Sequence, residues 1–275
     1  MPKHKTSRSA PPPPAPVPGR SLRLPALLGA GVIAVLVVVG TLAFVLTAGG
    51  SSGPGVKTAV IVDQLSLTAA NPDFVSQARA TLASAGYQVD YVPGEQVTVD
   101  YYRELPNRHY DVLLLRVHAG ITTEVSADSG QRLETEYVSL FTGEPYSDTK
   151  YSAEQLNRLG KARYTDSSPP LFGIGPEFVQ YSMDGDFGGA VVVMMGCDGL
   201  KSQRTAEAFL SKGASAFVSW SKPVSAPHTD TATENLLQQF LVNKKPIEQA
   251  VKDAAAEVGP DPSTGAELRI LTPGS

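Results

Sequence analysis

An uninterrupted apolar run covers residues 190–195 (Ala-Val-Val-Val-Met-Met) and leads directly into Gly196 and Cys197, with Gly199 close behind. A run of this length, closed by glycines, is typical of a strand that is buried on both faces of a parallel sheet. Cys197 is the only cysteine of the chain, and it follows this strand at its carboxyl end. In open α/β sheets, ligands bind at that edge. The run therefore predicts an α/β fold with its single thiol at the functional edge.

A second, mostly apolar run covers residues 110–117 and is followed directly by His118, with Gly120 two residues later. If both runs are parallel strands of one sheet, His118 and Cys197 lie at the same edge. A neighbouring imidazole raises the thiolate fraction of a cysteine, so a cysteine and a histidine are the smallest set of residues that supports cysteine nucleophilic catalysis. The alternative reading of Cys197 is a small core residue, because free cysteine is among the most buried residue types.

The hydrophobic pattern of the rest of the folded domain also predicts an α/β fold. Before His118, strands and helices alternate, which is the pattern of a doubly wound α/β layer. The expected strands cover residues 56–62, 87–92 and 111–117, and the expected helices cover 71–85 and 100–105. After Cys197 we expect helices at 203–211, 229–241 and 246–255 and strands at 214–220 and 267–271.

Residues 121–189 interrupt this alternation. Polar and apolar residues alternate over 132–141, which predicts an antiparallel hairpin inserted at the functional edge. A short helix is expected at 153–159. Long insertions of this kind usually bind substrate or act as lids.

The amino-terminal part predicts a membrane anchor. Residues 1–23 are basic and proline-rich and are expected to be a disordered tail. Residues 24–48 carry no charge over about 25 residues, enough for a helix that spans the membrane, and residues 49–55 form a flexible linker. A cleaved signal peptide is the alternative to an uncleaved anchor. Residues 56–275 then form the folded domain.

The charge distribution bears on orientation and partners. Five lysines and arginines and no acidic residue precede residue 57, leaving 18 basic and 27 acidic residues in the rest of the chain. Positive charges before the apolar segment predict a cytoplasmic amino terminus and an extracytoplasmic domain, at the cell membrane. The acidic domain lacks the basic stripe of a nucleic-acid-binding protein. A single cysteine excludes an internal disulfide.

These features together resemble the caspase-like superfamily of cysteine peptidases, which includes caspases, gingipains, clostripain, separase and bacterial CHAT domains. In that family one strand ends in His-Gly and a later strand ends in the catalytic cysteine. Val117-His118-Ala119-Gly120 and Gly196-Cys197-Asp198-Gly199 occupy these two places here. Residues 206–220 and 246–251 resemble the gingipain and CHAT branches. The resemblance covers residues 56–256 and implies a three-layer α/β/α sandwich with a mainly parallel sheet.

The resemblance also implies roles for individual residues. Cys197 would attack the scissile carbonyl of a peptide or protein substrate, and His118 would protonate the leaving amine. The backbone N–H groups of Gly120 and Cys197 would form the oxyanion hole. Trp220 and Asp230 would belong to the substrate pocket, where Asp230 would select arginine or lysine. Asp230 at a helix start is equally well an N-cap.

Two residues depart from the family pattern, because Gly196 replaces the residue that commonly precedes the cysteine and Ala119 follows the histidine. Ala119 stands between His118 and Gly120, and this insertion favours a second hypothesis, an inactive caspase-like binding or sensory domain. A flavodoxin-like ligand-binding domain is a third hypothesis, which requires His118 and Cys197 to lie far apart. Asp184 and Asp198 are weaker pocket candidates.

No cofactor is expected. His118, Cys197, Asp198, His228 and Asp230 are metal-ligand types, but they lack the paired spacing of zinc motifs. No glycine-rich phosphate-binding motif follows the first strand, which argues against a nucleotide.

Overall fold

The structure is a computed structural model that describes residues 55–125, 128 and 130–275. The predicted tail, the predicted membrane helix and all of the linker except Gly55 therefore lie outside the described residues. Within the described residues, no helix combines the length and the apolar character needed to cross a membrane.

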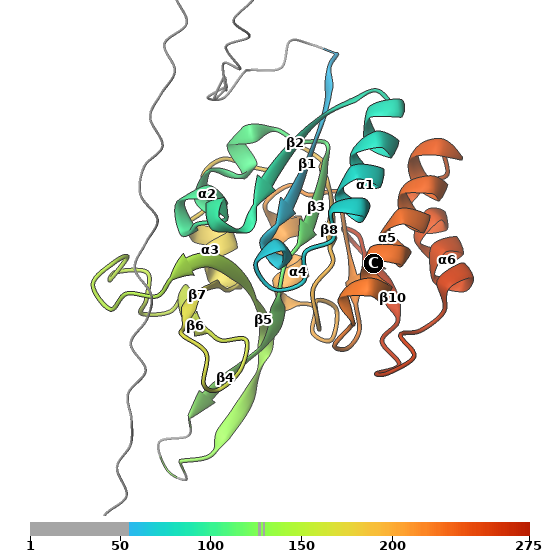
Figure 1. The fold of residues 1–275 in the computed structure, drawn as a ribbon. Coiled ribbons are helices and arrows are strands. Elements are labelled where there is room, and N and C mark those ends of the chain that lie inside the picture. The colour runs from blue at the N-terminus through green and yellow to red at the C-terminus, as the bar shows by residue number, and fades with distance from the viewer. Residues whose placement is uncertain (1–54, 126–127, 129) are drawn as a thin grey trace, which may run out of the picture. The chain divides into compact units, whose positions relative to one another are not determined.

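A mostly parallel six-stranded sheet forms the centre of the domain, with the strand order β10-β9-β8-β3-β1-β2 (Figure 1). Neighbouring strands from β2 to β9 pair in parallel, and only β10 is antiparallel. The strands are β1 Lys57–Asp63, β2 Tyr87–Pro93, β3 Val112–Arg116, β8 Val191–Met194, β9 Ala216–Trp220 and β10 Leu268–Leu271. The predicted α/β class is confirmed.

The inner strands are buried along their whole length because helices cover both faces of the sheet. Every residue of β3, β8 and β9 is buried, as expected for apolar runs in a parallel sheet. The helices are α1 Pro72–Ser84, α2 Val99–Glu104, α3 Pro176–Tyr181, α4 Arg204–Ser211, α5 Ala226–Leu237 and α6 Ile247–Val258, and a π-helical turn covers Gln238–Val242.

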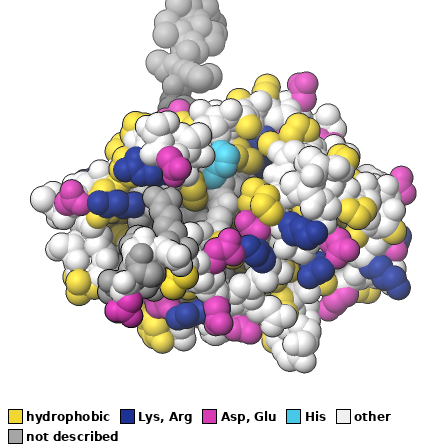
Figure 2. Space-filling model, turned by 90° about the horizontal axis from the view of Figure 1, so that it is seen from below, with side chains coloured by type: hydrophobic (Ala, Val, Ile, Leu, Met, Phe, Trp, Pro, Cys, Tyr) yellow, Lys and Arg dark blue, Asp and Glu magenta, His cyan; other side chains and the backbone are white. Residues whose placement is uncertain are grey.

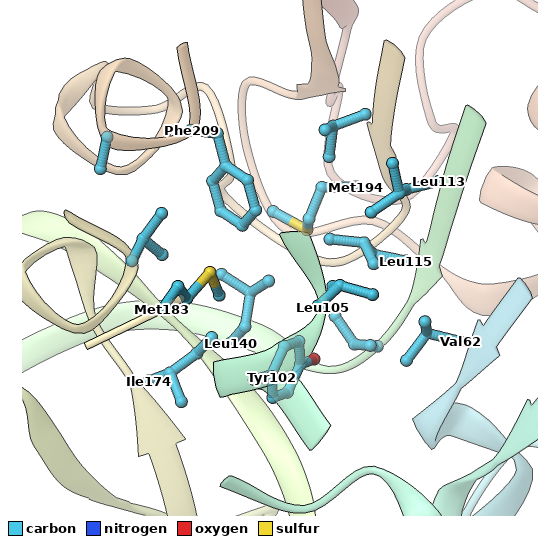
Figure 3. Close-up of a cluster of buried hydrophobic side chains, with 14 of the residues drawn as sticks. Val62, Tyr102, Leu105, Leu113, Leu115, Leu140, Ile174, Met183, Met194 and Phe209 are labelled. Atoms are coloured by element: carbon cyan, nitrogen blue, oxygen red, sulfur yellow. The ribbon is translucent and has the colours of Figure 1, made fainter. Parts of the chain in front are cut away.

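An apolar cluster lies on each face of the central sheet and joins it to the layer of elements that covers that face. Helices α1, α5 and α6 pack on one face of the sheet, as Figure 1 shows. Helices α2, α3 and α4 pack on the other face together with part of a second sheet. In this second cluster, Leu113, Leu115 and Met194 of the central sheet meet Phe209 of α4 and Leu140 of the second sheet (Figure 3). The domain is therefore a mixed α/β sandwich.

The second sheet has four strands in the order β4-β5-β7-β6. Its strands are β4 Ala119–Val125, β5 Arg132–Pro145, β6 Leu159–Ala162 and β7 Leu171–Ile174. Strands β4 and β5 form the antiparallel hairpin that the alternation over residues 132–141 predicts. The helix expected at residues 153–159 is wrong, because residues 153–158 form turns and β6 begins at Leu159.

Candidate functional site: His118 and Cys197 at the carboxyl edge of the sheet

Strands β3 and β8 are neighbours, and they bring His118 and Cys197 to the same edge. They pair in parallel up to Leu115 opposite Met194, and each chain runs on for three residues to the histidine or the cysteine. Gly196 lies against the chain on either side of His118: a Cβ atom at Gly196 would stand 2.4 Å from the Val117 carbonyl oxygen. Only glycine permits this close approach.

The His118 ring is half-buried and is held from several sides. Its Nε2 atom lies 2.8 Å from the Thr68 hydroxyl, and its backbone N–H donates to the side-chain oxygen of Gln64 over 2.9 Å. The ring centroid lies 4.9 Å from that of Tyr164 and 5.8 Å from that of Phe141. These contacts fix the plane of the ring and leave Nδ1 as the nitrogen without a hydrogen bond in the described part of the chain.

The environment of His118 favours its neutral form. Burial lowers the pKa of His118 below 6.5, and the positive charge of Arg116 acts in the same direction. At neutral pH the ring is therefore uncharged and available as a base.

The Cys197 thiol is half-buried beside Val224, in the loop that follows β9. The Val224 N–H donates to Sγ over 3.4 Å, and the thiol donates to the Val224 carbonyl oxygen over 3.6 Å. No hydrogen bond joins this thiol to the His118 ring among the described residues. Burial raises the pKa of Cys197, and the carboxylates of Asp198 and Asp261 also favour the protonated form. The thiol is thus protonated at neutral pH.

The β4–β5 pairing determines where the Gly120 N–H group points. The Phe141 N–H donates to the His118 carbonyl, and Gly120 stands opposite Ser139, two residues further along each strand. Because hydrogen-bonded pairs alternate in an antiparallel ladder, the Gly120 N–H faces Ser139. The N–H groups of Ala119 and Cys197 are not committed in this way, so the ladder disfavours the oxyanion role expected for Gly120.

Asp230 lies in a buried ion pair, which corrects the expected pocket role. Its two carboxylate oxygens accept from Arg116 at 2.8 Å each, and Arg116 also donates to Asp63 over 2.8 Å. All three residues are at most 3% exposed. Burial works to lower the pKa of Arg116, but the hydrogen bonds to the two carboxylates outweigh it. Asp230 is also the fifth residue of α5, so it is not an N-cap.

Trp220 is likewise part of the core. It is 1% exposed, and its ring N–H donates to the Thr229 hydroxyl over 2.9 Å. Its backbone carbonyl accepts from the Leu200 N–H. A side chain enclosed in this way does not line an open pocket.

The remaining candidates do not gather into a site. The His228 ring nitrogen Nε2 contacts the Gly259 carbonyl oxygen, and Asp184 is exposed. Asp198 is buried, with one carboxylate oxygen lacking a hydrogen-bond partner among the described residues. No three His, Cys, Asp or Glu side chains in the described ranges are placed to share a metal ion.

The face seen from below the domain in Figure 1 has a mixed charge. Figure 2 shows lysine and arginine side chains interspersed with acidic side chains, without a continuous basic surface.

Sequence reasoning missed Gln64 and Thr68, which hold His118 from the chain that follows β1. Gln64 is fully buried and also donates to the Tyr164 hydroxyl over 2.7 Å. Neither residue has a local signal, because the contact joins positions about 50 residues apart.

Fold and site together define an α/β domain with a cysteine and a histidine at neighbouring strand ends. Scans of protein-family models and of curated proteins return no match to this chain.

Proposed function

We propose that this chain is a membrane-anchored, extracytoplasmic cysteine endopeptidase of the caspase-like type. The observation that carries the proposal is the adjacency of β3 and β8, which are followed by His118 and Cys197 at the same edge of a parallel sheet. The backbone of Gly196 packs directly against Val117 beside the histidine. The flavodoxin-like hypothesis requires the two residues to lie far apart, so this adjacency disfavours it.

The chemistry uses the free Nδ1 of His118. This nitrogen takes the thiol proton while Sγ of Cys197 bonds to the scissile carbonyl carbon. The Ala119 and Cys197 N–H groups donate to the resulting oxyanion. The C–N bond then breaks, and His118 returns the proton to the leaving amine. Water attacks the thioester, which releases the carboxylic acid and restores the thiol.

Thr68 acts as a positioning residue in this scheme. Its hydroxyl occupies Nε2, so the ring presents Nδ1 to the thiol. The lowered pKa of His118 keeps the ring uncharged at neutral pH. In the tautomer that this scheme uses, Nε2–H donates to the Thr68 hydroxyl and Nδ1 carries the free lone pair.

Cleavage of fluorescein-labelled casein by the full chain in detergent micelles tests the proposal. We expect cleavage by the wild type and a loss of at least 100-fold in both Cys197→Ala and His118→Ala, since general acid–base and nucleophilic groups each contribute about 10² or more. Equal cleavage by the wild type and Cys197→Ala would refute the assignment.

A non-enzymatic binding domain is the second candidate, and one observation favours it. The thiol hydrogen bonds to Val224 instead of His118, and burial raises its pKa. Binding of casein without cleavage by the wild-type chain would support this candidate.

The membrane anchor is a separate part of the proposal and rests on the charge-free residues 24–48. The full chain should stay with the membrane pellet after alkaline carbonate extraction. A variant lacking residues 24–48 should be released. Release of the full chain would contradict the anchor.

A further inference from the structure

The first part of β4 is an edge strand without the usual protection. β4 lies at the edge of the second sheet in the described part of the chain, and residues 119–121 (Ala-Gly-Ile) carry no charge. The charged residue of β4 itself, Glu124, follows the register shift between Ile121 and Thr123, and the other edge strands carry Asp90 in β2, Lys161 in β6 and Arg269 in β10. Charged residues on edge strands prevent pairing with other chains. Residues 119–121 are therefore an edge segment without a charged side chain that would prevent pairing with another strand.

The hydrogen-bond pattern turns the main chain of this segment outward. Ile121 stands opposite Val138, but the Val138 N–H and carbonyl both bond to the Thr205 hydroxyl, at 3.0 and 2.8 Å. Val138 therefore faces away from β4, as expected at a non-hydrogen-bonded pair. Ala119 occupies the equivalent position opposite Leu140. The N–H and carbonyl groups of Ala119 and Ile121 therefore point away from β5; Ala119 is 8% exposed and Ile121 is half-buried.

A groove of about 530 Å³ begins beside this segment. Ile121 and residues 134–136 of the hairpin line one side, and residues 201–204 with Glu207 line the other. The second wall begins at Lys201, four residues after Cys197. A β-bulge between Ile121 and Thr123 ends the regular edge. The groove therefore lies over the β4–β5 hairpin, between Ile121 and the amino-terminal part of α4.

We propose that a polypeptide substrate binds as an extended strand along residues 119–121 and is held mainly through its main chain. The identity of this occupant rests on the proposed peptidase function. Ala119 follows His118 directly, and a Cβ atom at Gly196 would lie 2.9 Å from that of Ala119. A strand on this edge therefore reaches the end of β8 next to Cys197. Added strands gain affinity from main-chain hydrogen bonds, so recognition tolerates many side chains.

Two substitutions of Ile121 test the pairing in the full-length Cys197→Ala protein. Ile121→Pro removes the outward N–H group, and an edge strand tolerates proline at such a position. Ile121→Val keeps the N–H and is the matched control. Fluorescence anisotropy measures the binding of fluorescein-labelled casein. Its dissociation constant should be at least about fivefold higher for Ile121→Pro than for Ile121→Val, which is the effect of losing one net main-chain hydrogen bond. Equal binding by the two variants would overturn the proposal.

Hydrogen exchange of the Cys197→Ala protein gives a second test that needs no change in β4. Casein should slow exchange at the Ala119 and Ile121 amides, while Gly120, already facing β5, serves as the internal control. No slowing at Ala119 and Ile121 would also overturn the proposal. If casein protects these amides but the wild-type chain does not cleave casein, the peptidase function is refuted and the proposed binding edge stands. Cleavage without protection would refute the edge alone.

Discussion

The side chains around His118 explain how a single histidine can serve as a base here. Thr68 fixes Nε2 and Gln64 fixes the backbone N–H, so the ring has one orientation and one free nitrogen. Burial and Arg116 keep it neutral. At the residue scale, these contacts prepare His118 to act as a base, whereas the surroundings of the thiol favour its protonated form.

Thr68 is exposed, so its hydroxyl can be removed without disturbing the core. Thr68→Val should lower kcat for casein cleavage about fivefold, the cost of one lost net hydrogen bond, with KM unchanged. Thr68→Ser keeps the hydroxyl and should retain the wild-type rate. Equal kcat values for Thr68→Val and the wild type would show that the ring needs no such support.

The pH dependence of cleavage follows from the lowered pKa of His118. Protonation of the ring removes the base, so kcat/KM should fall as pH decreases, with a midpoint below 6.5. The unfolded chain binds this proton more tightly than the folded chain, so stability should also decrease as pH falls through that range. A pH–rate profile from 4.5 to 8 measures the midpoint. A midpoint above 6.5 would contradict the environment described for His118.

Gly196 allows a paired test of the close approach between the two strand ends. A Cβ atom there would meet the Val117 carbonyl oxygen at 2.4 Å, whereas one at Gly120 would meet nothing within 4 Å. Gly196→Ala should therefore destabilise the domain by about 1–3 kcal/mol, and Gly120→Ala should leave stability nearly unchanged. Urea unfolding of both variants measures the difference, and similar midpoints would contradict the packing.

At the element scale, Arg116 ties β1, β3 and α5 together. It joins Asp63 at the end of β1 to Asp230 in α5, and it also donates to the Ala69 carbonyl. One guanidinium serves two carboxylates, and Tyr91 and Asn71 donate further hydrogen bonds to them. This cluster anchors the loop that carries Thr68.

Loss of Arg116 should therefore be severe. Arg116→Met leaves two buried carboxylates without their cation and should cost about 3–5 kcal/mol of unfolding free energy. The exposed Arg269, paired with Glu267, provides the matched control, since Arg269→Met should cost less than about 1 kcal/mol. Chemical denaturation compares the two, and equal effects would contradict a structural role for the buried cluster.

The sequence predicts some elements well and others not at all, for physical reasons. Apolar runs such as residues 190–195 identify the buried strands because burial on both faces demands them. Strands β6 and β7 have four residues each, too few to show a period, and their sheet is formed by contacts distant in sequence. Trp220 and Asp230 looked like pocket residues because their position along the chain does not reveal that Thr229 and Arg116 enclose them.

At the scale of the whole molecule, the strand order places both candidate catalytic residues near the middle of one sheet. β3 and β8 are the two central strands of six, so His118 and Cys197 leave the most rigid part of the domain. The hairpin of β4 and β5 starts directly after His118 and borders the groove. The domain thus places the two candidate residues beside the first strand of the second sheet.

The most direct test of a working Cys197–His118 pair is the alkylation rate of the only cysteine. Iodoacetamide should modify Cys197 of the full chain at pH 7 at least tenfold faster in the wild type than in His118→Ala, because the neutral imidazole accepts the thiol proton. Equal rates in the two proteins would mean that Cys197 is an ordinary buried thiol, and the peptidase assignment would fail.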